Sequence, residues 1–131
     1  MKFANFDVST LPIVVVKVAG FDPTPKQYEE EFLNVLENIF NENEGVLFLI
    51  NVKDVKYLSA ELRIKVGHWL KHNDPKIKTN VRGVCFFGAS VIFNVILKGI
   101  FLIATVPAPV HVCNDFAAAE KWASQISKTH A

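Results

Sequence analysis

The clearest indication of the fold is the segment Val46-Leu-Phe-Leu-Ile-Asn-Val-Lys-Asp-Val-Lys-Tyr-Leu-Ser-Ala-Glu-Leu62. It opens with a nearly continuous apolar run, which is typical of a strand buried on both faces of a sheet. Ser59 follows a short crossing and is a favoured N-cap residue, so we expect a helix to begin there. A buried strand that leads into a helix is the repeating unit of parallel α/β sheets.

Strands and helices alternate on both sides of this stretch. Thr24, Pro25 and Gln27 predict a helix start, because they supply an N-cap, a proline at the first helical position and a capping box. The apolar stripe of that helix is Tyr28, Phe32, Val35, Leu36, Ile39 and Phe40. The predicted strands cover residues 3–8, 11–19, 46–52, 81–87 and 110–113. The later helices are predicted to begin at Ser59, at about Ser90, and at Asn114 or Asp115.

The resulting order is ββαβαβαβα, which predicts one α/β domain over residues 1–131. Strands separated by helices imply parallel neighbours with right-handed crossovers, whereas the opening hairpin must be antiparallel. We therefore expect a mixed β-sheet of about five strands, flanked by about four helices that cover much of both faces. The helix from Ser59 is expected to stop before Asp74-Pro75, because the residue before a proline avoids the helical conformation.

Composition narrows the class of protein. Fourteen basic and thirteen acidic side chains give a net charge of +1, without the concentrated basic patch of a nucleic-acid binder. Cys85 and Cys113 are too few for a disulfide framework, which favours a reducing, cytoplasmic location. The apolar stretch 84–107 is broken by Gly88 and Lys98, so we expect no transmembrane span.

Residues capable of chemistry do not assemble into a recognisable catalytic site. His68 and His72 have the spacing of paired metal ligands, but no further ligand is placed to complete a set. His111 and Cys113 share one face of a strand at a separation of roughly 6–7 Å, which is too far for a nucleophile pair. We therefore expect no catalytic residue, no metal and no cofactor, and a protein that is not an enzyme.

The opening stretch and a second one, Pro109-Val-His-Val-Cys-Asn-Asp-Phe-Ala-Ala-Ala-Glu-Lys-Trp122, resemble the STAS (anti-sigma-factor antagonist) superfamily, most closely its SpoIIAA-like branch. The second stretch is similar to the closing strand of that branch and to its helix with Ala and Trp three residues apart. The architecture also resembles the CRAL-TRIO lipid-binding domains. The resemblance covers nearly the whole chain, and it implies a regulatory module that acts through protein contacts.

One departure from the STAS pattern changes what the resemblance implies. Phosphorylated STAS proteins accept a phosphate from a partner kinase on a serine in the turn after the central strand. The matching positions here are Ala60 and Glu61, and neither residue has a hydroxyl to accept the phosphate. Ser59 does have one, but we expect its oxygen to cap the helix that follows.

The predicted helix 90–103 is apolar over about 240° of its circumference, whereas one sheet contact needs little more than 100°. Ser90, Asn94 and Lys98 form a narrow polar stripe. The residues opposite, which we assign to the sheet, are Ile92, Ile96 and Ile103. One flank carries Phe93, Leu97 and Ile100 and the other carries Val91, Val95 and Leu102, while Phe101 lies on the polar stripe.

This excess of apolar surface predicts an interaction or ligand face formed by Phe93, Leu97, Ile100 and Phe101, unless neighbouring helices cover that face. The leading hypothesis is a non-enzymatic STAS-like interaction module that forms a homodimer through this helix. The alternative is a binder or carrier of an apolar small molecule or lipid in a groove beside the helix. Peripheral attachment to a membrane through the same flank is a third hypothesis.

Overall fold

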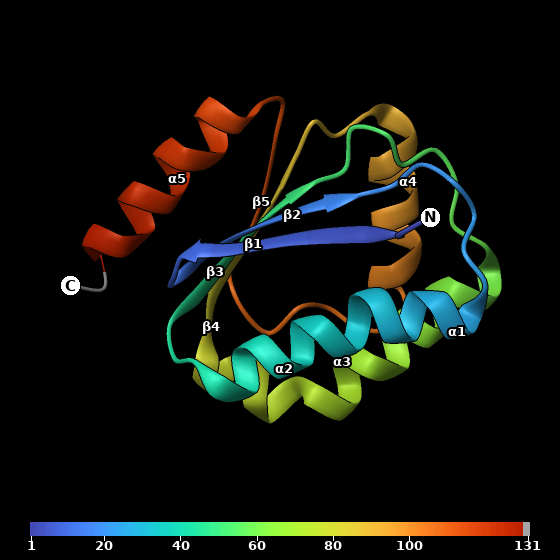
Figure 1. Ribbon diagram of the computed structural model, residues 1–131, viewed down its shortest axis with the longest axis horizontal. Coiled ribbons are helices and arrows are strands. Elements are labelled where there is room, and N and C mark those ends of the chain that lie inside the picture. The colour runs from blue at the N-terminus through green and yellow to red at the C-terminus, as the bar shows by residue number, and fades with distance from the viewer. Residues whose placement is uncertain (130–131) are drawn as a thin grey trace.

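The computed structural model describes residues 1–129, which form a five-stranded sheet flanked by helices (Figure 1). The strands lie in chain order: β1 (Ala4–Thr10), β2 (Ile13–Val18), β3 (Val46–Asn51), β4 (Val81–Phe87) and β5 (Val110–Cys113). β1 is antiparallel to β2, and each later pair of neighbours is parallel. The predicted α/β class, with a mixed sheet and an opening antiparallel hairpin, is confirmed.

The helices follow the predicted order. The first helical segment is continuous and consists of α1 (Pro25–Tyr28), a π-helical turn (Glu29–Leu33) and α2 (Asn34–Glu42). The others are α3 (Ala60–Asn80), α4 (Val91–Phe101) and α5 (Phe116–Thr129). With α1 and α2 taken as one segment, the observed order is ββαβαβαβα.

The helices cover the two faces of the sheet unequally. The larger core lies between the sheet and helices α1 to α4, whereas α5 alone packs on the other face (Figure 1). The second face is covered less completely: Leu47, Leu49, Cys85 and Phe87 are buried under α5, whereas Lys17 of β2 is exposed. The cause is the strand order, because successive right-handed crossovers that advance in one direction return on the same side of the sheet.

Side-chain caps begin the helices where they were predicted. Thr24 Oγ1 accepts a hydrogen bond of 3.1 Å from the Gln27 N–H, and Ser90 Oγ accepts one of 3.1 Å from the Phe93 N–H. The capping box is only half formed, because the Gln27 side chain donates to the carbonyl oxygen of Met1 instead of returning to the cap. The first helix is thereby tied to the start of the chain.

Helix α3 does not stop before Pro75, and this corrects the sequence prediction. Proline lacks the N–H that would complete the helical ladder, which normally disfavours it inside a helix. Packing beyond the proline compensates, since Ile77 is buried and Asn80 Nδ2 donates a 2.6 Å hydrogen bond to the carbonyl oxygen of Phe40. Contacts with α2 therefore carry α3 to Asn80.

Helix α5 reaches the sheet through a slot above Gly83. A Cβ atom at this position would lie 2.6 Å from the Trp122 ring, so only glycine leaves room for the indole. The imidazole of His111 stacks on the same ring, with centroids 5.6 Å apart and planes inclined by 6°. Ala119 and Ala123 are buried beside it.

Candidate functional site

Helix α4 is turned by about 80° from its predicted orientation. Phe93, Leu97 and Ile100 face the core, whereas Ile92, which was assigned to the sheet, is 52% exposed. The reason is that α4 packs chiefly against α3 and stands further from the strands. Ile103, also assigned to the sheet, instead packs on Gly67 of α3.

This orientation corrects the prediction of an outward face. Phe93, Leu97 and Ile100 are buried within the subunit, and Phe101 is half-buried against the same core. A second copy cannot reach them in the folded protein. They lie instead on the inner side of α4, where they line a cavity.

The cavity lies between the sheet and helices α1 to α4, and its volume is about 140 Å³. Every side chain that lines it is hydrophobic, and the lining extends from Phe3 and Val18 at one end to Val84 and Phe86 on β4. Helix α4 contributes Phe93, Ile96, Leu97, Ile100 and Phe101. An apolar cavity of about 150 Å³ is large enough to hold benzene and stays free of water.

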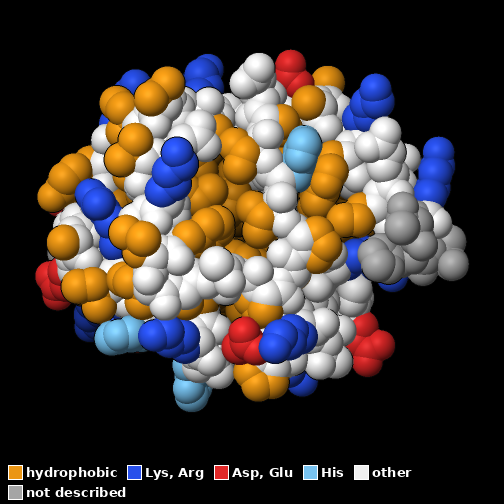
Figure 2. All heavy atoms as spheres, turned by 180° about the vertical axis from the view of Figure 1, so that it is seen from behind, with side chains coloured by type: hydrophobic (Ala, Val, Ile, Leu, Met, Phe, Trp, Pro, Cys, Tyr) orange, Lys and Arg blue, Asp and Glu red, His pale blue; other side chains and the backbone are white. Residues whose placement is uncertain are grey.

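The cavity is not sealed from the surface. Its lining includes the half-buried side chains of Phe101 and Val106, and also Tyr57, which is 60% exposed. Seen from behind, the molecule has a hollow in which hydrophobic side chains gather (Figure 2). Partly exposed side chains thus form part of the cavity wall.

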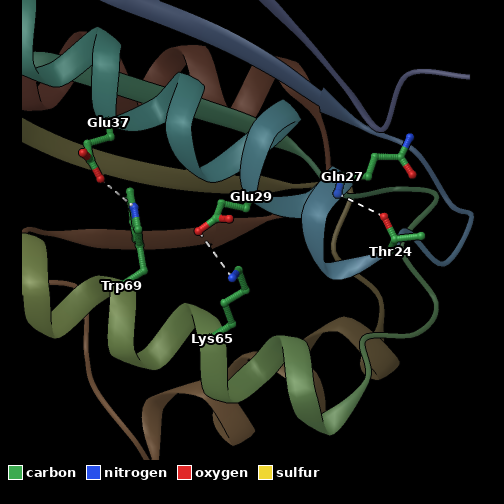
Figure 3. A network of polar contacts seen from close by, with 6 residues as sticks. All are labelled: Thr24, Gln27, Glu29, Glu37, Lys65 and Trp69. Atoms are coloured by element: carbon green, nitrogen blue, oxygen red, sulfur yellow. Dashed lines mark hydrogen bonds and ion pairs between the residues drawn. The ribbon is translucent and has the colours of Figure 1, made fainter.

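Polar contacts between the helices fix one wall of the cavity. The indole N–H of Trp69 donates a 3.1 Å hydrogen bond to Glu37 Oε1 (Figure 3). Nearby, Lys65 Nζ and Glu29 Oε1 form an ion pair at 3.4 Å (Figure 3). Trp69 is a lining residue, so its indole is held in place by α2 while its ring faces the cavity.

Tyr28 is the one deeply buried lining residue that carries a hydroxyl. It was predicted as part of an apolar stripe, and the structure leaves it 6% exposed. Its ring lies 5.2 Å from Phe3 and 5.3 Å from Phe32, measured between ring centroids. Burial raises the pKa of the Tyr28 phenol, which therefore stays protonated at neutral pH. The only hint in the sequence was a single hydroxyl within an otherwise hydrocarbon stripe.

The other residues considered for chemistry are placed apart from this cavity. The His111 ring stacks on Trp122, while Cys113 Sγ lies 3.5 Å from Cys85 Sγ. His68 and His72 are both exposed on α3. Within residues 1–129, no three His, Cys, Asp or Glu side chains come together in a way that would hold a metal ion.

The positions that match the STAS phospho-acceptor turn lie in the first turn of α3. Ala60 and Glu61 are exposed there. Ser59 Oγ accepts a 3.2 Å hydrogen bond from the Leu62 N–H, so the predicted N-cap is confirmed. The hydroxyl of Ser59 is thus engaged by the helix that it begins.

The outward side of α4 carries a second apolar feature, which we call the outer stripe: Val91, Val95 and Leu102. These residues are 82%, 61% and 88% exposed, respectively. They lie directly opposite the buried residues of the same helix. The helix therefore does carry more apolar surface than the core covers, as predicted. This surface lies on the flank of Val91, Val95 and Leu102, which was not the flank predicted to be the interaction face.

Comparison with known proteins adds no relative. No family model, no curated protein and no solved structure matches the chain significantly. The resemblance to SpoIIAA-like STAS domains therefore stays a prediction from the sequence. None of the helices in the described part of the chain has the length and apolar character needed to cross a membrane.

Proposed function

We propose that this protein is a non-enzymatic binding module that holds a small apolar molecule in the cavity between the sheet and helices α1 to α4. The observation that carries the proposal is the cavity of about 140 Å³, lined by hydrophobic side chains that include Phe93, Leu97, Ile100 and Phe101. Water inside such a space finds few hydrogen-bonding partners, whereas an apolar ligand gains van der Waals contacts. This supports the ligand version of the sequence hypothesis.

The size of the cavity limits the ligand. Sites for drug-sized molecules usually measure about 300–1,000 Å³, well above the volume seen here. A single aromatic ring or a short alkyl group fits, because a cavity of about 150 Å³ accommodates benzene. A complete long-chain lipid would have to leave most of its chain outside.

A titration with toluene, followed through the methyl NMR signals of the full chain, tests the proposal. We expect saturable shifts at methyl groups that line the cavity, including those of Leu97 and Ile100. Leu97→Phe should weaken toluene binding at least severalfold, because the larger side chain occupies cavity volume.

The matched control is Leu102→Phe, the same substitution on the same helix but at a residue that is 88% exposed. It should leave toluene binding unchanged. Absence of saturable shifts, or equal binding by both variants, contradicts the proposal. Ile100→Phe provides a second cavity-filling variant if Leu97→Phe does not fold.

A second candidate function is self-association through the outer stripe, and its exposure is the observation that favours it. Burying a side chain such as Val or Leu is worth roughly 1.5–3 kcal/mol. Burial of Val91, Val95 and Leu102 between two copies of the protein would therefore stabilise a dimer. A stripe on one helix can meet its own copy across a twofold axis. A homodimer of this kind would act through protein contacts, as the STAS resemblance implies.

Light scattering across a concentration series tests this second role. We expect a dimer that Leu102→Ser weakens and that Lys121→Ser, at an exposed residue of α5, leaves intact. A monomer at high micromolar concentration contradicts self-association.

We further propose a cytoplasmic location, because Cys85 and Cys113 are free thiols and reducing compartments preserve free thiols.

A further inference from the structure

We infer that the Tyr28 hydroxyl is a polar anchor inside the cavity, so that the ligand is a small neutral amphiphile: a compact hydrocarbon body with one hydroxyl or carbonyl group. This inference rests on the proposed function of the cavity, and it names the class of ligand. It also assigns a binding role to one residue, Tyr28 of α1.

The position of Tyr28 suits an anchor. The side chain lines the cavity, and only 6% of the residue is exposed. The rings of Phe3 and Phe32 contact it from two sides at centroid distances of 5.2 Å and 5.3 Å, so the phenol has little freedom to turn away. A ring held in this way presents its oxygen in a fixed direction.

The Tyr28 hydroxyl has no hydrogen-bond partner among the groups that the structure describes. Other buried polar groups of the same core are paired: Asn73 Nδ2 donates to Glu37 Oε1, and Asn80 Nδ2 donates to the Phe40 carbonyl. Buried polar atoms in native proteins nearly always have a partner, and an exception calls for an explanation. A ligand that supplies the missing partner explains this one.

The unpaired oxygen also borders open space. Every fully enclosed side-chain oxygen or nitrogen of the described residues has a hydrogen-bond partner. Since the Tyr28 oxygen has none, it is not fully enclosed. Tyr28 lines the cavity, so the cavity is the open space beside its side chain. The indole N–H of Trp69, which also belongs to a lining residue, is already bonded to Glu37. The Tyr28 hydroxyl is therefore the buried group that is available for a hydrogen bond with a ligand.

The charge of the lining excludes an ionic head group. Among the residues that the structure describes, no Lys, Arg or His side chain lines the cavity. A carboxylate placed there would lose its hydration without gaining a counter-charge, which is strongly unfavourable. A neutral phenol such as Tyr28 can donate to a carbonyl or hydroxyl oxygen and accept from a hydroxyl. The ligand head is therefore neutral.

Phenol and toluene form a matched pair of probes, because they have the same size and shape and differ by a hydroxyl in place of a methyl. We would measure the Kd of each for the full-length wild type and for Tyr28→Phe by NMR titration. We expect Tyr28→Phe to weaken phenol binding about fivefold or more, since the phenol hydroxyl is left unpaired. The Kd for toluene should change less than about twofold, which shows that the variant keeps its cavity.

Tyr57→Phe is the matched control, because Tyr57 also lines the cavity but is 60% exposed. It should leave the ratio of the two Kd values unchanged. If toluene binds and phenol binding is insensitive to Tyr28→Phe, or equally sensitive to Tyr57→Phe, the anchor is refuted and the proposed function stands. If neither probe binds the wild type, the proposed function fails and the anchor fails with it.

Discussion

The indole N–H of Trp69 on α3 donates a 3.1 Å hydrogen bond to Glu37 Oε1 on α2. Asn73 Nδ2, one turn further along α3, donates to the same oxygen at 3.1 Å. One carboxylate thus satisfies a lining residue of the cavity and a buried amide. Through these two hydrogen bonds Glu37 joins α2 to α3.

Glu37→Ala is expected to lower the free energy of unfolding by about 1–3 kcal/mol, since the Trp69 indole loses its acceptor and Asn73 keeps only its bond to the Trp69 carbonyl oxygen. Urea denaturation, followed by the fluorescence of Trp69 and Trp122, measures the change. Glu37→Gln keeps an oxygen at this position and should recover most of the loss. The exposed Glu42→Ala, at the end of the same helix, should have little effect. A Glu37→Ala variant as stable as the wild type contradicts this role.

Gly83→Ala is expected to destabilise the protein by about 1–3 kcal/mol, as overpacking in a tight core does. Its Cβ would lie 2.6 Å from the Trp122 ring, which is itself stacked on His111. Gly99→Ala on α4 is the comparison. There a Cβ meets only the flexible end of Arg63 at 3.4 Å, so the gain in helix propensity should stabilise by about 0.5–1 kcal/mol. Thermal unfolding of both variants should show shifts of opposite sign.

Tyr28→Phe should stabilise the ligand-free protein by about 1 kcal/mol. The wild type buries a hydroxyl without a partner, and the substitution removes that cost while it keeps the ring. Differential scanning calorimetry on protein freed of bound molecules by refolding would measure the gain. Tyr57→Phe should leave the melting temperature unchanged, because that hydroxyl is solvated. A less stable Tyr28→Phe variant would mean that the hydroxyl has a partner inside the fold.

Alkaline conditions should weaken the fold through Cys85. Burial, and then the adjacent Cys113 thiol, raises the pKa of Cys85 from 9.0 to about 12. The unfolded chain releases this proton near pH 9, whereas the folded chain retains it, so stability falls as the pH rises from about 9 towards 12. Urea unfolding at pH 8 and pH 10 should show a smaller loss for Cys85→Ala than for the wild type. An equal loss would contradict the prediction.

Local patterns predicted the elements of the fold well. Ser59, Thr24 and Ser90 cap helices as expected, since a cap depends only on residues close by in the chain. The end of α3 was predicted wrongly because Pro75 is a local signal, whereas Ile77 and Asn80 are held by distant partners. Tertiary packing outweighed the proline.

The candidate site was harder to predict than the fold. The periodicity of the sequence showed that α4 has more apolar surface than one sheet contact can bury. It could not show that α3 packs on the side of α4 near Gly99, which leaves Phe93 and Leu97 facing the core. The cavity depends on side chains from many elements, and no local pattern reports the volume left between them. The roles of Tyr28 and Glu37 emerge only once their neighbours are known.

The matching of sheet order to chain order has a consequence for synthesis on the ribosome. Each strand pairs with an edge already formed by the strand before it, so the sheet can extend as the polypeptide emerges. The face of the sheet opposite helices α1 to α4 is the exception, because Leu47, Leu49 and Cys85 are buried only once α5 packs on it. A nascent chain stalled before α5 would expose an apolar sheet surface, so the synthesis of α5 protects the sheet from aggregation.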